Sequence, residues 1–276
     1  MRKSYILACS PVKAYAHALK VAKPQAFLLV SAFISNEILI YESGRNPLLY
    51  PAGNLFIPAP HGRLEAIIKD PRANGTRDEP SARDETASRG VALVLHPHPL
   101  HGGTMHNKVV FRAAAALNDA GLTTLRINFR GVGLSTGTHD NARGEQDDAR
   151  AGLDYLQQHY PNKAMTLAGF SFGARVGLET GIRDARVERL ISIGTPVNMY
   201  DFAFLEDCRK PILFVHGDRD EFGSIENLRA LARKLPAEAR ARLVVIENAG
   251  HFFEGHLDEL KHAITNWTNE QLAGQV

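Results

Sequence analysis

The sequence has little of three things that would mark a specialised class of protein: cysteine, long apolar runs and charge of one sign. Its two cysteines, Cys9 and Cys208, argue against a disulfide scaffold and predict a reducing, cytoplasmic location. No apolar run is long enough to span a membrane, and the one before Cys9 is too short for a secretion signal, so neither a membrane partner nor export is expected. The 32 basic and 30 acidic residues leave a net charge of +2, which gives no reason to expect a nucleic-acid partner.

The sequence has 276 residues, of which 44% are hydrophobic, and this is long and apolar enough for one large α/β domain. Apolar strands alternate with helical stretches from residue 54 onward. We expect strands at 55–57, 64–68, 91–95, 123–129, 165–168, 190–193, 212–215 and 243–246, and helices at 107–120, 143–159, 172–182, 225–235 and 254–271. Most of these strands are continuous apolar runs, which is typical of strands buried on both faces. We therefore predict a mostly parallel sheet of about eight strands with helices on both faces.

The chain divides at about residue 54. Residues 1–53 find no place in this alternation and are predicted to be an N-terminal extension of unknown role, whereas residues 54–276 form the α/β domain. For the extension, an extra helix, a partner-binding arm and translated sequence upstream of the true start stay open. Within the domain, residues 70–90 are rich in charged residues, proline and glycine, which predicts a solvated loop.

Two serines occupy a Gly-x-Ser-x-Gly pattern, and their contexts differ. In a parallel sheet, ligands bind beyond the carboxyl ends of the strands. Ser171 lies between a strand and a helix, where a sharp turn can hold a nucleophile up at that edge. Ser135 lies well after its strand, in a stretch where no helix starts before about Arg143, so we interpret its hydroxyl as satisfying a loop. We predict that Ser171 is the nucleophile.

A base and an acid are expected at two other strand ends. His251 follows the last predicted strand and precedes the last helix, which makes it the candidate base. Asp218 and Asp220 both follow the preceding strand, and either could orient the imidazole. We favour Asp220 and interpret Asp218 as a turn or capping residue. The chain order Ser171, Asp220, His251 is that of the α/β-hydrolases.

Four segments together carry a resemblance to a known family: residues 96–110, 169–173, 216–220 and 250–253. As a set they resemble the small, lidless α/β-hydrolases of bacteria, relatives of the dienelactone hydrolases, over about residues 54–276. The resemblance implies an α/β-hydrolase fold with no large cap domain. Dienelactone hydrolases use a cysteine nucleophile, whereas this elbow holds Ser171, so dienelactone chemistry itself is not implied.

The same resemblance implies an oxyanion hole. In many α/β-hydrolases the loop after the third strand reads His-Gly-x-Pro, and the backbone N–H of x binds the oxyanion. Aligned on His96-Pro97-His98-Pro99, x is His98, and neither flanking proline has an N–H to donate. The second donor is expected to be the N–H of Phe172, at the start of a helix.

No metal or cofactor is expected. Four histidines gather in one loop, but no nearby carboxylate completes a three-ligand set: His96, His98, His101 and His106. The Gly131-Val132-Gly133 stretch is too short for a dinucleotide fingerprint.

The predicted activity is hydrolysis of a small-molecule carboxylic ester through an acyl-enzyme on Ser171. The segment between the strands ending near Ile193 and beginning near Ile212 is too short for a large cap. Its apolar residues either line an acyl pocket or belong to the core: Met199, Tyr200, Phe202, Phe204 and Leu205. Thioesterase, acyltransferase or peptidase activity with the same triad, and a non-catalytic binding protein on this fold, are the alternatives.

Overall fold

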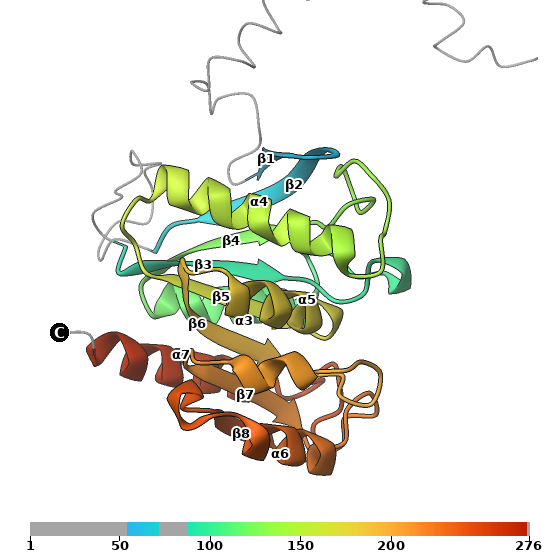
Figure 1. The fold of residues 1–276 in the computed structure, drawn as a ribbon, viewed down its shortest axis with the longest axis vertical. Helices are drawn as coiled ribbons and strands as arrows, with labels where there is room; N and C mark the ends of the chain where they lie inside the picture. Colours follow the sequence, from blue (N-terminus) through green and yellow to red (C-terminus); the bar gives the residue numbers. More distant parts are fainter. Residues whose placement is uncertain (1–53, 72–87, 275–276) are drawn as a thin grey trace, which may run out of the picture. The chain divides into compact units, whose positions relative to one another are not determined.

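Eight strands lie side by side in the order β1-β2-β4-β3-β5-β6-β7-β8 in the computed structural model, which describes residues 54–71 and 88–274 (Figure 1). The strands are β1 (Asn54–Ala59), β2 (Gly62–Lys69), β3 (Gly90–Leu95), β4 (Leu122–Ile127), β5 (Met165–Phe170), β6 (Val187–Ile193), β7 (Ile212–Gly217) and β8 (Arg242–Ile246). The β1–β2 hairpin is antiparallel and β2 is antiparallel to β4, while all other neighbours are parallel. The predicted mostly parallel sheet is confirmed.

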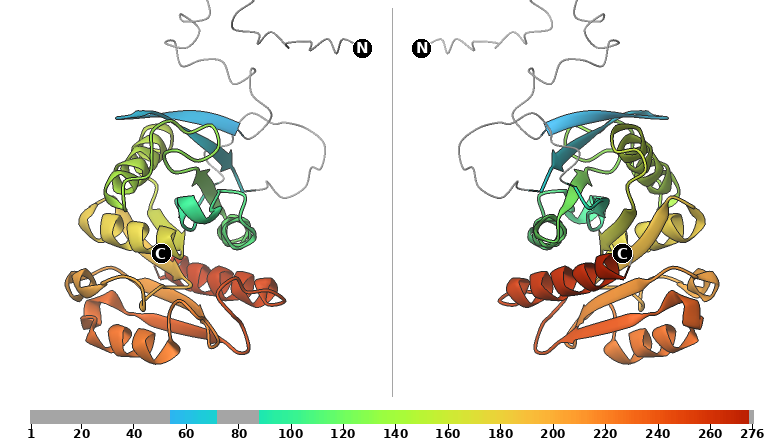
Figure 2. Two further views of the ribbon diagram at one scale, coloured as in Figure 1. Left: turned by 90° about the vertical axis from the view of Figure 1, so that its right-hand side faces the viewer. Right: turned by 90° about the vertical axis from the view of Figure 1, so that its left-hand side faces the viewer.

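Helices cover both faces of this sheet. The helices are α3 (Lys108–Asp119), α4 (Arg143–His159), α5 (Phe172–Arg183), α6 (Ile225–Lys234) and α7 (Leu257–Ala273). Figure 2 shows α3 and α7 on one face, where they pack together, and α4 and α5 on the other. Each face buries its own apolar cluster, so the predicted arrangement of helices on both faces is confirmed.

β3 shows why the buried strands are apolar throughout. Val91, Leu93 and Leu95 belong to the cluster under α4 and α5, whereas Ala92 and Val94 belong to the cluster under α3 and α7. Successive side chains of a strand point to opposite faces, and both faces are covered here. No position on β3 is left for a polar residue, because all six residues are buried.

Several predicted boundaries shift by one to three residues, as in β6, which begins at Val187 rather than Leu190, and two of the shifts have a clear cause. β4 ends at Ile127 rather than Phe129, because the Phe129 N–H leaves the sheet and donates to the His96 ring at 3.0 Å. α7 begins at Leu257 rather than Glu254, because Phe253 and Gly255 have φ angles of 54° and 78°, which a right-handed helix excludes.

The described chain contains no cap domain. Residues 194–211, between β6 and β7, form only one short 3₁₀ helix, η3 (Ala203–Asp207). Across residues 54–71 and 88–274, no helix is both long and apolar enough to cross a membrane. The predicted N-terminal extension, residues 1–53, and most of the predicted loop at 70–90 lie outside the described residues.

Candidate active site

Ser171 is the single residue between β5 and α5, and its backbone is strained. Its φ and ψ angles are 56° and −118°, a conformation that costs a non-glycine residue roughly 1–3 kcal/mol. The Ser171 N–H donates to the Ile193 carbonyl at 2.9 Å, which ties the turn to the end of β6. The surrounding sheet therefore holds the Ser171 side chain at the carboxyl edge.

The two glycines of this turn permit a close approach between α5 and the sheet. A Cβ atom on Gly169 would lie 2.2 Å from the carbonyl oxygen of Gly173. A Cβ atom on Gly173 would lie 2.5 Å from the carbonyl oxygen of His96, at the end of β3. Both distances are far below van der Waals contact, so any side chain at either position would push the helix away.

The imidazole of His251 faces the Ser171 hydroxyl. His251 follows β8, and its Nε2 lies 2.9 Å from Ser171 Oγ. The ring is 3% exposed and lies between the rings of Phe170, Phe222 and Phe252, with centroids 4.9, 4.6 and 5.2 Å away. This aromatic packing fixes the ring plane while leaving Nε2 directed at the hydroxyl.

Asp220 holds the other side of the His251 ring. Its Oδ2 lies 2.8 Å from His251 Nδ1, and its Oδ1 accepts the N–H groups of Phe222 and Gly223 at 2.9 and 3.2 Å. Because a carboxylate only accepts, His251 Nδ1 carries the proton and Nε2 is free to accept from Ser171. Asp218, the alternative acid, is exposed and lies outside this chain of hydrogen bonds.

A second buried histidine, His216, lies beside Asp220 without competing with His251 for its carboxylate. The Nε2–H of His216 donates to the Gly223 carbonyl at 2.6 Å and lies 3.7 Å from Asp220 Oδ2. Burial lowers the pKa of His216, so its ring is neutral. His216 therefore places no positive charge beside the Asp220 carboxylate that would compete with His251.

Ser135 has a structural role. Its hydroxyl is buried, donates to the Asn128 carbonyl at 2.8 Å and accepts the Glu65 N–H at 2.9 Å. These bonds join the loop after β4 to β2. The interpretation that this hydroxyl satisfies a loop agrees with these contacts.

The two residues predicted to supply the oxyanion donors contact each other through their rings. His98 precedes the short 3₁₀ helix η2 (Pro99–His101), and Phe172 is the first residue of α5, with the two rings 4.9 Å apart. Neither backbone N–H donates to another residue of the described chain. Two unoccupied donors beside a nucleophile can bind an anion.

His96 has no ring nitrogen left for a ligand. Its Nδ1 donates to the Pro97 carbonyl at 2.6 Å, and its Nε2 accepts the Phe129 N–H at 3.0 Å. Burial lowers the pKa of His96 to about 4, so the ring is neutral at physiological pH. This histidine ties β3 to the end of β4.

The apolar segment between β6 and β7 is only partly buried in the core. Phe202 and Leu205 are buried in the core beneath α5. Tyr200 instead packs edge-on against Phe172, with ring centroids 6.4 Å apart, and its partial burial raises its pKa. Met199 is 52% exposed. Phe202 and Leu205 therefore belong to the core, Tyr200 and Phe204 pack against it, and a role for the exposed residues of this segment in lining an acyl pocket stays a prediction.

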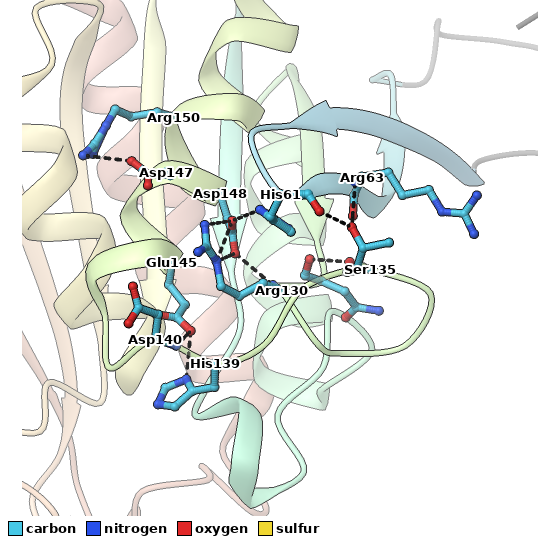
Figure 3. A network of polar contacts seen from close by, with 12 residues as sticks. His61, Arg63, Arg130, Ser135, His139, Asp140, Glu145, Asp147, Asp148 and Arg150 are labelled. Carbon is cyan, nitrogen blue, oxygen red and sulfur yellow. Dashed lines mark hydrogen bonds and ion pairs between the residues drawn. The ribbon is translucent and has the colours of Figure 1, made fainter.

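Sequence reasoning missed His139 and Glu145. The ring of His139 lies 4.9 Å from that of His98 and 5.6 Å from that of Phe172. Its Nδ1 lies 2.8 Å from Oε1 of Glu145, which is fully buried (Figure 3). Glu145 accepts the Ala142 N–H at 2.8 Å, as in a helix-capping box, but Ala142 lacks the capping hydroxyl that would have revealed the motif.

Comparison with known proteins shows to which family the chain belongs. A family model of the α/β hydrolase fold matches residues 100–209. A solved α/β serine hydrolase homologue from Coxiella burnetii is 37% identical, covering 79% of this chain and 98% of that one, with a TM-score of 0.69. A solved α/β serine hydrolase without a lid, from Xanthomonas campestris, is 33% identical over 82% of this chain and 98% of that one, with a TM-score of 0.71. The chain belongs to the lidless α/β serine hydrolases.

Other relatives of this lidless hydrolase add less about function. An uncharacterized protein of Rickettsia prowazekii is 41% identical over 220 residues, which are 77% of this chain and 87% of that protein. Est1E from Butyrivibrio proteoclasticus, at 18% identity and a TM-score of 0.65, shows a shared fold only. The resemblance drawn from the sequence motifs is confirmed at the level of the family.

Proposed function

We propose that this lidless hydrolase cleaves small carboxylic esters through an acyl-enzyme, with Ser171 as nucleophile, His251 as base and Asp220 as orienting acid. One observation carries the proposal. Ser171 Oγ, His251 Nε2, His251 Nδ1 and Asp220 Oδ2 form a continuous hydrogen-bonded chain with distances of 2.9 and 2.8 Å. Such a chain is what proton removal from a serine hydroxyl requires.

Each step follows from these contacts. As Ser171 Oγ attacks the ester carbonyl, its proton passes to His251 Nε2, and Asp220 stabilises the resulting imidazolium. The imidazolium then gives that proton to the oxygen of the leaving alcohol. A water molecule, deprotonated by the same Nε2, then attacks the acyl-enzyme. As the bond to Ser171 Oγ breaks, Nε2 returns this proton to Oγ and the acid is released.

The oxyanion of the tetrahedral intermediate is proposed to bind the N–H groups of His98 and Phe172. Support comes from Phe172 directly following Ser171, from the contact between the rings of His98 and Phe172, and from the absence of any other acceptor for the two N–H groups in the described chain. The positive end of α5 adds to the stabilisation, because Phe172 is the first residue of that helix.

A small substrate fits the architecture, since residues 194–211 add no cap over the Ser171 edge. Thioester and peptide cleavage use the same three residues, so a panel of ester, thioester and peptide substrates decides among them. The proposal includes a cytoplasmic location, supported by the scarcity of cysteine; in the described chain Cys208 is buried as a free thiol.

Covalent labelling tests which serine is the nucleophile. We expect a fluorophosphonate probe to modify Ser171 and to leave Ser135 untouched, because only the Ser171 hydroxyl faces a base. Peptide mapping by mass spectrometry reads the modified residue directly. Heat-unfolded protein is the control and should not be labelled. Modification of Ser135, or of neither serine, would contradict the proposal.

A backbone change tests the His98 donor. We expect His98→Pro to lower kcat by roughly 10²–10³-fold, the usual cost of losing one oxyanion donor. Proline fits this position, because His98 has a φ of −54° and its N–H makes no other hydrogen bond within residues 54–71 and 88–274. His98→Ala is the matched control, since it removes the same ring but keeps the N–H. Equal kcat values for the two variants would exclude the donor role.

A further inference from the structure

The rings around Ser171 fall into two groups. In the first, the rings of Phe170, Phe222 and Phe252 contact that of His251. In the second, the rings of His98, His139 and Phe172 contact one another, His101 stacks on His98 at 4.4 Å, and Tyr200 packs on Phe172. Within the described chain, no ring of one group contacts a ring of the other.

The proposed chemistry assigns a side of the substrate to each group. His251 Nε2 must deliver a proton to the leaving oxygen, so the leaving group lies on the His251 side of Ser171. The carbonyl oxygen is directed to the donors His98 and Phe172, and the acyl group is the remaining substituent, on the side away from His251 where the second ring group lies. The second ring group is therefore the acyl side. This assignment rests on the function proposed above.

His139 is supplied to that side by the loop between β4 and α4. The loop is held firmly (Figure 3). Arg130, at its start, forms an ion pair with buried Asp148 at 2.8 Å, and Ser135 bonds back to β2. At its other end, Glu145 accepts the Asp140 N–H at 3.0 Å and lies against the His139 ring.

Three rings of this group, those of His98, His139 and Phe172, are mutually tilted. Their planes differ by 45° between His98 and His139, by 52° between His98 and Phe172, and by 54° between His139 and Phe172. Aromatic rings prefer tilted or offset contacts with another ring, and an alkyl chain gains none of this directional attraction. The ring of His139 contacts the rings of both residues predicted to supply the donors, without supplying a donor itself.

We propose that His139, which lies against buried Glu145, is a specificity-determining residue that favours substrates with a flat, aromatic acyl group. The two proposed donors are backbone groups of other residues. Replacing the His139 side chain thus changes the acyl side while keeping the nucleophile, the base and both donors.

The test compares two esters with one leaving group, p-nitrophenyl benzoate and p-nitrophenyl butyrate. His139→Leu replaces the ring by an alkyl side chain of similar size, and we expect it to lower the benzoate-to-butyrate ratio of kcat/KM roughly threefold to tenfold. His139→Phe restores a ring at this position and should keep the wild-type ratio. Phe252→Leu is the matched control on the leaving-group side and should leave this ratio unchanged. Butyrate hydrolysis by His139→Leu verifies that the variant is folded.

The outcomes separate the two proposals. If the wild type hydrolyses both esters through Ser171 and the ratio is unchanged in His139→Leu, the inference alone is wrong. It is also wrong if Phe252→Leu shifts the ratio and His139→Leu does not, because the sides are then reversed. If the wild type hydrolyses neither ester, or Ser171→Ala hydrolyses both at the wild-type rate, the proposed function fails and the inference falls with it.

Discussion

Ser171→Ala is expected to lower kcat for p-nitrophenyl butyrate by roughly 10⁴–10⁶-fold, with little change in KM, because the covalent path is lost while the binding surface remains. In the structure the Ser171 hydroxyl is the only group that His251 Nε2 contacts by hydrogen bond among the described residues. The residual rate is expected to come from substrate binding and the proposed oxyanion donors. Release of p-nitrophenol under saturating ester measures the effect. Activity within tenfold of the wild type would exclude Ser171 as nucleophile.

Ser135→Ala is the matched control, since it deletes the same atom from the same sequence pattern. Its hydroxyl makes two buried hydrogen bonds, to Asn128 and from Glu65, so the variant should lose about 1–3 kcal/mol of unfolding free energy. Its kcat should stay within roughly tenfold of the wild type, because the triad is untouched. A thermal melt and the ester assay on one preparation measure both quantities. A large loss of kcat with an unchanged melting temperature would contradict this assignment of roles.

The topology and the placement of the three residues could be inferred from sequence for a common physical reason. Strands buried on both faces are apolar throughout, so β3, β5 and β7 stand out, and in a parallel sheet their carboxyl ends share one edge. Ser171, Asp220 and His251 each follow a strand at this edge, and the structure brings them together. Their catalytic roles stay predictions that the variants above test.

The parts that the sequence did not reveal depend on loop conformation. His139 lies in a stretch rich in Gly, Thr, Asn and Asp, with no periodic pattern to place it. It lies against Glu145, whose capping role is masked by an alanine at the helix start. Likewise, periodicity at 254–256 suggested helix, but the positive φ at Gly255 delays the start of α7. Backbone angles of this kind are set by tertiary contacts rather than by local composition.

Asp220→Asn is expected to lower kcat by roughly 10⁴-fold, and the structure gives a specific cause. Asp220 Oδ1 accepts the N–H groups of Phe222 and Gly223, so in the variant the amide oxygen must occupy that position. The amide nitrogen is then forced toward His251 Nδ1, which must accept. The ring proton moves to Nε2, and this nitrogen can no longer take the Ser171 proton.

This cause is separable from simple loss of charge. We expect the imidazole ¹⁵N spectrum of Asp220→Asn to show the Nε2–H tautomer of His251, where the wild type shows Nδ1–H. Asp218→Asn is the matched control: Asp218 is exposed and outside the hydrogen-bonded chain, so kcat should change by less than about twofold. If Asp220→Asn keeps Nδ1–H and still loses activity, the charge of Asp220 dominates over its control of the tautomer. If instead Asp218→Asn abolishes activity, the acid has been assigned to the wrong residue.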